Sequence, residues 1–261
     1  MSEKPLILVA NDDGVEAEGN RILREALDSL GEVWTVAPRR EQSTNSHSLT
    51  LHKPLRLEKM AKRVYAVDGT PADCTYVALF HDDLLPRTPD LVVSGINHGP
   101  NLGTDVMYSG TVAAAMEATI EGLPALAVSC ADFRWRHFKP SASLALDVAE
   151  GMLRQGWPER LLLNLNVPPL PQEAIGPLRW CRTAVRRYID QFDRRTDPRG
   201  RTYYWLAGEV ANDLEAAVAG PGEWPTDVAW IAEGGVSLSP LQPELFWRGD
   251  SQSLPEVQAL R

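Results

Sequence analysis

Residues 5–14 read Pro5-Leu6-Ile7-Leu8-Val9-Ala10-Asn11-Asp12-Asp13-Gly14, an apolar run that ends on two adjacent carboxylates. A short aliphatic run bounded by turn residues predicts a buried strand of a parallel sheet. Open α/β sheets bind their ligands at the carboxyl ends of such strands. We therefore expect Asp12 and Asp13 to lie at a ligand-binding edge of the sheet, with Gly14 allowing the sharp turn that follows.

The acid pair has two interpretations. Two neighbouring carboxylates repel each other, and a divalent cation removes that repulsion. Carboxylate oxygens are natural ligands of Mg²⁺ and Mn²⁺, so the pair predicts a metal site. The alternative is a helix N-cap, because Asn and Asp side chains commonly accept hydrogen bonds from the free amides at the start of a helix.

Composition limits the class of protein. At 261 residues and 44% hydrophobic, the chain can form one large domain or a domain with an appendage. A net charge of −9 argues against binding along a nucleic-acid duplex. An odd number of widely spaced cysteines suggests no disulfide framework and favours the cytoplasm. The apolar stretch 112–131 contains two glutamates and a proline, so no membrane span is expected.

Strands and helices alternate along the first two-thirds of the chain. Hydrophobic spacing predicts strands at 6–10, 33–37, 64–67, 90–93, 125–129 and 161–167, and helices at 22–30, 71–79, 112–118 and 141–153. Such alternation is typical of an α/β fold with a Rossmann-like, doubly wound, mostly parallel sheet. We expect residues 1–170 to form this core and to contain the catalytic site. No G-x-G-x-x-G sequence follows the first strand, which removes the usual dinucleotide fingerprint.

Residues 171–261 have a different composition, and we expect a β-hairpin arm and a C-terminal oligomerisation segment there. The stretch 179–206 is rich in Arg, Tyr and Trp and contains a turn at residues 197–200, which predicts a projecting hairpin. An isolated hairpin is marginally stable in water, so we expect it to pack against a second subunit. Its run Tyr203-Tyr204-Trp205 either packs at that contact or stacks on a base. Gly220-Pro221-Gly222 is typical of a hinge, and residues 226–241 are predicted to form strand.

Three polar segments follow predicted strands and should share one edge of the sheet. The loop 39–50, which contains Ser43, is either a solvated connection or a source of oxygen ligands for a cation or phosphate. Asn97 supplies a neutral oxygen after the strand at 90–93. Ser109-Gly110-Thr111 opens a helix, whose free amides and dipole make a ready anion site. The alternative there is an ordinary Ser or Thr cap.

Three motifs occur together in this order: Asn11-Asp12-Asp13-Gly14, Ser94-Gly95-Ile96-Asn97 and Tyr108-Ser109-Gly110-Thr111. In these motifs the chain resembles the SurE family of stationary-phase survival proteins, which are divalent-metal-dependent nucleotidases and phosphatases. The resemblance is close over the N-terminal core to about Ala131, weaker through the hairpin, and returns over residues 226–241. The combination of the three motifs is highly specific.

The resemblance implies roles for particular residues. One divalent ion per subunit, Mg²⁺ or Mn²⁺, would be bound by four oxygen ligands: Asp12, Asp13, Ser43 and Asn97. The phosphate-binding group would consist of Asn11, which shapes the site, together with Asn101, Ser109, Gly110 and Thr111. The residues implied to be catalytic are Asp12, Asp13 and Asn97. The chain departs from the family pattern at Thr44, where a smaller residue is expected, and at Arg39, where an acidic residue is common.

The resemblance also implies a reaction and an assembly. The expected substrates are nucleoside 5′-monophosphates, with 3′-monophosphates left open, hydrolysed by a metal-activated water that Asp12 orients or deprotonates. A homodimer or homotetramer is expected, with the arm and a swapped C-terminal segment exchanged between subunits. Two alternatives stay open. One is a nucleotide-binding regulator without catalysis. The other is a phosphatase with an Asp nucleophile, for which a D-x-D pattern would be expected.

Overall fold

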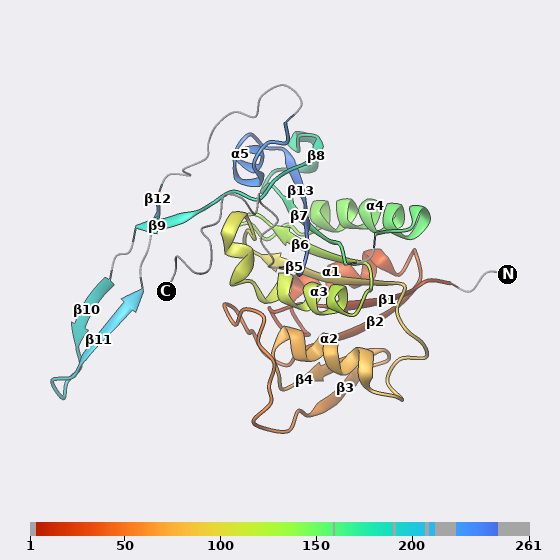
Figure 1. Ribbon diagram of the computed structural model, residues 1–261, viewed down its shortest axis with the longest axis horizontal. Coiled ribbons are helices and arrows are strands. Elements are labelled where there is room, and N and C mark those ends of the chain that lie inside the picture. Colours follow the sequence, from red (N-terminus) through yellow and green to blue (C-terminus); the bar gives the residue numbers. More distant parts are fainter. Residues whose placement is uncertain (1–3, 159, 190–191, 207–208, 212–222, 245–261) are drawn as a thin grey trace, which may run out of the picture.

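The computed structural model describes residues 4–158, 160–189, 192–206, 209–211 and 223–244 (Figure 1). Its main feature is a nine-stranded sheet in the order β3-β4-β2-β1-β5-β6-β7-β13-β8. The strands from β4 to β7 in this order run parallel, whereas β3 and β13 are antiparallel to β4 and β7. The strands of this sheet are β1 (Leu6–Ala10), β2 (Glu32–Pro38), β3 (Leu57–Ala61), β4 (Val64–Val67), β5 (Leu91–His98), β6 (Ala125–Cys130), β7 (Leu162–Val167), β8 (Leu178–Trp180) and β13 (Val236–Leu241).

Helices cover both faces of the sheet. α1 and α4 pack against each other on one face, and α2 and α3 pack together on the other. Side chains alternate accordingly along β1, where Ile7 and Val9 join the core under α1 and α4, and Leu8 joins the core under α2 and α3. The predicted doubly wound, mostly parallel α/β fold is confirmed. The helices of the main body are α1 (Glu18–Leu27), α2 (Pro71–Phe80), η1 (Gly103–Met107), α3 (Gly110–Ile120), α4 (Lys139–Gln155), η2 (Gln172–Ala174) and α5 (Asp227–Ala232).

One crossover connection differs in hand from its neighbour. The strands β5, β6 and β7 follow one another in the same direction across the sheet, yet α3 lies on one face and α4 on the other. The connection β6–α4–β7 therefore has the opposite hand to β5–α3–β6, although right-handed crossovers are the strong rule. The segment 131–138 makes this possible, because it changes faces at the carboxyl edge of the sheet before α4 begins at Lys139.

Part of the chain beyond residue 170 extends the sheet. The strand β13 pairs with β7, and β8 pairs with β13. A hairpin is present where it was predicted, with β10 (Phe192–Thr196) antiparallel to β11 (Thr202–Leu206). A second antiparallel pair joins β9 (Arg187–Ile189) to β12 (Glu209–Ala211). Figure 1 shows β10 and β11 at the lower left, away from the sheet.

The predicted exchange of the arm between subunits, and the assignment of residues 171–261 to assembly, stay predictions. The hinge sequence Gly220-Pro221-Gly222 and the end of the C-terminal segment, residues 245–261, lie outside the described residues. Within the described ranges, no helix is long and apolar enough to cross a membrane.

The prediction of strand throughout residues 226–241 is wrong in its first half. Thr226 is the N-cap of α5, and its hydroxyl oxygen accepts a hydrogen bond from the backbone N–H of Ala229 at 3.2 Å. The helix ends before Gly234, whose φ of 81° favours glycine, and the strand begins at Val236. A Thr-Asp pair before an apolar run is a helix-start signal, and it outweighs the strand propensity of the residues that follow.

We expect Gly19→Ala to destabilise the fold. A Cβ atom at Gly19 would lie 2.3 Å from the carbonyl oxygen of Ile96, so α1 would have to move away from β5. The expected loss in the free energy of unfolding is about 1–3 kcal/mol, typical of overpacking. Urea unfolding followed by circular dichroism measures it.

The matched control is Gly151→Ala in α4, where no heavy atom lies within 4 Å of the added Cβ. This variant should gain about 0.5–1 kcal/mol, because alanine loses less backbone entropy than glycine in a helix. Equal effects at the two positions would contradict the close packing of α1 on β5.

Candidate active site

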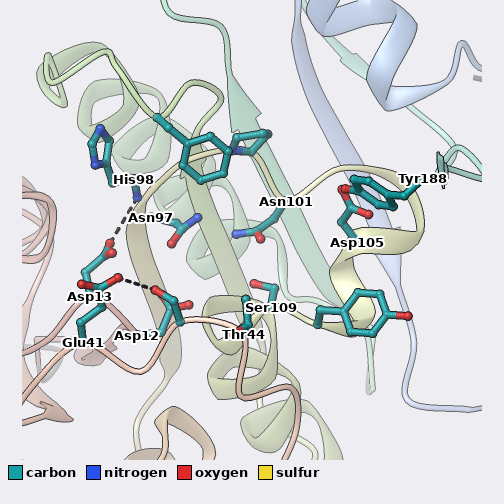
Figure 2. A pocket seen from close by; sticks show the side chains of 14 residues that line it. Asp12, Asp13, Glu41, Thr44, Asn97, His98, Asn101, Asp105, Ser109 and Tyr188 are labelled. Carbon is teal, nitrogen blue, oxygen red and sulfur yellow. Dashed lines mark hydrogen bonds between the residues drawn. The ribbon is translucent and has the colours of Figure 1, made fainter. Parts of the chain in front are cut away.

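A cavity of about 530 Å³ opens at the carboxyl edge of the sheet (Figure 2). Its walls come from segments that are distant in sequence: the loop after β1, the loop after β2, the end of β5, and the stretch between β5 and α3. The strands β2 and β5 flank β1 on opposite sides, and the ends of such strands are where open α/β sheets bind ligands. The lining residues from these segments are Asp12, Asp13, Glu41, Ser43, Thr44, Asn97, His98, Pro100, Asn101, Asp105, Tyr108 and Ser109.

Asp12 is buried and held from two sides. The hydroxyl of Thr111 donates a hydrogen bond to Asp12 Oδ1, and the backbone N–H of Gln42 donates to the Asp12 carbonyl oxygen at 2.7 Å. A Cβ at Gly110 would lie 2.8 Å from the Asp12 Cβ, so only glycine lets the first turn of α3 approach this closely. Burial raises the pKa of Asp12 to about 6, and the charge of Asp13 contributes to this rise.

Asp13 lies beside a third carboxylate that sequence analysis did not single out. Burial and the negative charge of Glu41 raise the pKa of Asp13, while the backbone N–H of His98 donates to its Oδ2 at 3.2 Å. The hydroxyl of Ser43 donates to Glu41 Oε1 at 2.7 Å, and Figure 2 shows Glu41 beside Asp13. Since its proton points to Glu41, the Ser43 oxygen keeps its lone pairs for a cation.

The two asparagines next to the acids occupy different positions. Asn97 lines the cavity, and its Nδ2 donates to the carbonyl oxygen of Gly99 at 2.9 Å, which leaves Oδ1 available as an acceptor. Asn11 is fully buried and does not line the cavity; its Nδ2 donates to the Gly14 carbonyl oxygen at 2.8 Å and so fixes the turn after β1. Asn11 is therefore placed to shape the site, and direct phosphate contact by it stays a prediction.

Three of the predicted phosphate-binding residues, Ser109, Gly110 and Thr111, form the start of α3, and Asn101 is held at the ends of β6 and β7. Ser109 is the N-cap and accepts a hydrogen bond from the Val112 N–H at 3.1 Å. Asn101 is buried nearby, with its Nδ2 donating to Ser129 Oγ at 2.8 Å. Both the hydroxyl and the backbone of Thr111 contact Asp12, so Thr111 orients that carboxylate. Phosphate binding by this group stays a prediction.

Aromatic side chains line part of the cavity. Tyr108, Phe133 and Tyr188 line it, and the ring of Phe133 lies where a Cβ on Gly99 would be. Phe133 belongs to the segment that changes faces before α4, and Tyr188 comes from β9 at the root of the hairpin. The phenol of Tyr188 donates to Asp105 Oδ2 at 2.5 Å. Burial and this hydrogen bond raise the pKa of Tyr188 to about 12, so it stays a donor.

The hairpin residues that sequence analysis offered for base stacking do not line this cavity. Tyr203, Tyr204 and Trp205 lie on β11 and are exposed in the described chain.

The structure also places the two residues that depart from the family pattern, Thr44 and Arg39. Thr44 has a φ of 60°, a conformation in which a glycine would be unstrained. Arg39 forms an ion pair with Glu58 of β3 and does not line the cavity.

The sequence of the chain is similar to those of known proteins. A family model described as Survival protein SurE matches residues 7–190. The chain belongs to the SurE family. It is 60% identical over 256 residues to a protein named 5′-nucleotidase SurE from Synechococcus sp. (strain RCC307), covering 95% of this chain and 92% of that protein. It is 56% identical over 256 residues to a protein of the same name from Prochlorococcus marinus (strain MIT 9303), covering 95% and 94%.

A solved structure of the family has the same fold. The crystal structure of the SurE protein from Aquifex aeolicus matches with a TM-score of 0.82 and 38% sequence identity. The match covers 98% of this chain and 99% of that chain. The likeness therefore includes the parts of the chain beyond the parallel core.

The donor set of this SurE-family cavity fits a hard divalent cation. Asp12 and Asp13 supply carboxylate oxygens, Asn97 an amide oxygen and Ser43 a hydroxyl oxygen. Four carboxylates line the cavity, and one of them, Asp105, is paired with Arg186; among the described residues no lysine or arginine lines the cavity itself. No three His, Cys, Asp or Glu side chains in the described part of the chain form a metal-binding group.

The alternative N-cap role for the acid pair is wrong. The helix α1 begins after Ala17, and no side chain caps it. Sequence analysis missed six lining residues of the SurE-family cavity, which are Glu41, His98, Pro100, Asp105, Phe133 and Tyr188. Glu41 and His98 lie within two residues of predicted ligands and could have been found by proximity in sequence. Phe133 and Tyr188 have no such signal, because their chain paths depend on the reversed crossover and the hairpin root.

We expect Asp12→Asn to stabilise the protein in EDTA at pH 8. The pKa of Asp12 is about 6 in the folded protein, whereas its ordinary value is 3.8. Between pH 3.8 and pH 6 the folded state therefore binds more protons than the unfolded state, and the free energy of unfolding falls as the pH rises through this range. Above pH 6 the buried charge destabilises the fold by about 3 kcal/mol. Asparagine removes this effect, so the gain should be large at pH 8 and small near pH 4 by urea unfolding.

The control is Asp90→Asn. Asp90 accepts hydrogen bonds from Arg87 and from the Leu6 N–H, and these contacts lower its pKa. Its ionised form stabilises the fold above its ordinary pKa, so this variant should lose stability at pH 8. A gain for Asp12→Asn that is equal at both pH values would contradict the raised pKa of Asp12.

Proposed function

We propose that this SurE-family protein hydrolyses nucleoside 5′-monophosphates to a nucleoside and inorganic phosphate, and that it requires one divalent cation per subunit. The observation that supports this most is the charge of the cavity, where the carboxylates of Asp12, Asp13 and Glu41 lie close to the start of α3 and no described lysine or arginine pairs with them. A phosphate ester would be repelled by these carboxylates unless a cation lay between them. The name 5′-nucleotidase of the 60% identical relative supports the choice of substrate.

The phosphate group would lie between the acid pair and the N-terminus of α3. The first amides of a helix have no intrahelical acceptor, and the helix dipole favours negative charge there. The glycine at Gly110 brings this end of α3 against Asp12, so anion-binding and cation-binding groups are neighbours. A divalent cation held by Asp12, Asp13, Ser43 and Asn97 would supply positive charge beside the phosphate oxygens and lower the pKa of a neighbouring water.

Asp12 would orient and deprotonate the attacking water. With a pKa of about 6 the carboxylate is ionised at neutral pH, and Thr111 fixes one of its oxygens. The water oxygen would form a bond to phosphorus as the bond from phosphorus to the sugar oxygen breaks. The departing sugar oxygen takes a proton from solvent water and leaves as a hydroxyl, and Asp12 then releases the proton it accepted to solvent.

The nucleoside would lie against the ring of Phe133. Phe133 lines the cavity, and 69% of its residue surface is exposed and free to stack on a base. Asp105 and Tyr188 also line the cavity and form a hydrogen-bonded pair, whose polar groups would meet sugar hydroxyls. These side chains therefore suit a flat, polar-edged leaving group.

Phosphate release from nucleoside 5′- and 3′-monophosphates, measured with EDTA and with added Mg²⁺ or Mn²⁺, tests this function. We expect release only with metal, and a loss of at least about 100-fold in Asp12→Asn, the scale of a lost general base. The variant should retain its circular dichroism spectrum.

Three outcomes would contradict the proposal. Near-wild-type turnover in Asp12→Asn would remove the role given to that residue. Tight nucleotide binding in EDTA without phosphate release would favour a regulator. A trapped aspartyl-phosphate would favour the covalent mechanism.

We expect Phe133→Ala to raise the KM for a nucleoside 5′-monophosphate by about 5- to 100-fold, the range of base–aromatic stacking energies. The KM for a small ester such as glycerol phosphate should change by less than about twofold, because that substrate has no base to stack. The control is Phe80→Ala, since Phe80 is 50% exposed on α2 and packs on Tyr76 away from the cavity. Equal changes in KM for both substrates would show that Phe133 only supports the segment 131–138.

A further inference from the structure

The loop between β2 and β3 is attached to the catalytic body at several points. The Gln42 N–H donates to the Asp12 carbonyl oxygen at 2.7 Å, and the Ser46 N–H donates to the Tyr108 carbonyl oxygen at 3.3 Å. The hydroxyl of Thr70 donates to the Ser48 carbonyl oxygen at 2.6 Å. Figure 2 shows Glu41 and Thr44 of this loop at the cavity. Its conformation therefore decides where Ser43 lies.

The loop contains strained backbone on both sides of residue 45. Thr44 has a φ of 60° and Ser46 a φ of 52°, and neither is glycine. Left-handed conformations of such residues persist only where surrounding contacts hold them. The backbone hydrogen bond from Ser46 to Tyr108 is one such contact, and a side-chain contact follows directly after it in the sequence.

His47 supplies that contact. Its Nε2 lies 2.6 Å from Glu117 Oε2, and it directly follows the strained Ser46. Glu117 lies on α3, and its side chain is only 6% exposed, so the carboxylate needs a polar partner. The same helix begins with Ser109 and Gly110 at the cavity. The pair thus links the loop to the helix that forms the opposite wall.

We propose that His47 is a positioning residue that fastens the loop 41–50 to α3 through Glu117 and thereby holds the Ser43 oxygen at the cation site. The part that concerns the cation rests on the proposed function. The part that concerns the loop does not, because it involves only His47, Glu117 and the backbone of the loop.

Hydrogen exchange of residues 41–50 in EDTA tests the fastening by itself. In His47→Ala we expect at least about tenfold faster exchange in this loop, with unchanged exchange in β1 and β5, because the opening is local. His47→Gln keeps a donor for Glu117 and should restore slow exchange. His52→Ala, an exposed histidine that follows the loop, is the matched control and should behave as wild type. Unchanged exchange in His47→Ala would overturn the proposal.

Mn²⁺ titration followed by electron paramagnetic resonance tests the consequence for the cation. We expect His47→Ala to weaken Mn²⁺ binding by about 10- to 100-fold, the usual effect of removing a residue that orients a ligand. The Mn²⁺ concentration for half-maximal turnover should rise equally, with kcat at saturating Mn²⁺ close to that of wild type. Faster loop exchange with unchanged Mn²⁺ affinity would overturn the proposal.

The two proposals fail in different ways. If the wild-type protein binds no Mn²⁺, the proposed function fails, and the exchange result still decides the fastening of the loop. If His47→Ala does not fold, Glu117→Gln tests the same contact from α3, since its neutral amide weakens the pair and keeps the volume. Wild-type exchange and wild-type Mn²⁺ affinity in Glu117→Gln would then overturn the proposal.

Discussion

The hydrogen bond from Thr111 to the buried carboxylate of Asp12 joins the first strand to the third helix, and the cavity depends on it. Asp12 also accepts the Gln42 amide through its carbonyl oxygen, so the loop after β2 is attached at the same point. The approach is possible because Gly110 has no side chain to separate α3 from Asp12. Three segments of the chain therefore meet at one residue, and a change there alters the positions of all of them.

This arrangement buries negative charge that the fold alone does not neutralise. Burial raises the pKa values of both Asp12 and Asp13, and the neighbouring Glu41 adds to the effect on Asp13. Such groups oppose folding at neutral pH, and the binding of a cation relieves the same electrostatic repulsion. The buried carboxylates of the cavity thus lower the free energy of unfolding of the protein, and the same groups are available to bind a ligand, as is common in functional sites.

The acidic and the aromatic lining of the cavity depend on different parts of the tertiary structure. The acidic residues come from strand ends and from the loop that His47 fastens to α3. The aromatic residues need the reversed β6–α4–β7 connection, which brings Phe133 onto Gly99, and the root of the hairpin, which brings Tyr188 to Asp105. Substrate preference can therefore change through the segment 131–138 or the hairpin root without any change in the acid pair.

The sequence by itself determined the order of strands and helices in the core, the location of the cavity at the sheet edge where Asp12 and Asp13 lie, and the start of a helix at Ser109. These features follow from local periodicity and from the chemistry of neighbouring residues, which act within a few positions along the chain. Only the tertiary structure decided that Thr111 orients Asp12, that α5 replaces the expected strand after Thr226, and that Phe133 lines the cavity. These features depend on which face of the sheet a connection takes and on which side chains meet across it. Packing between segments that are distant in sequence sets both the face that a connection takes and the side chains that meet, and no local sequence pattern encodes this packing.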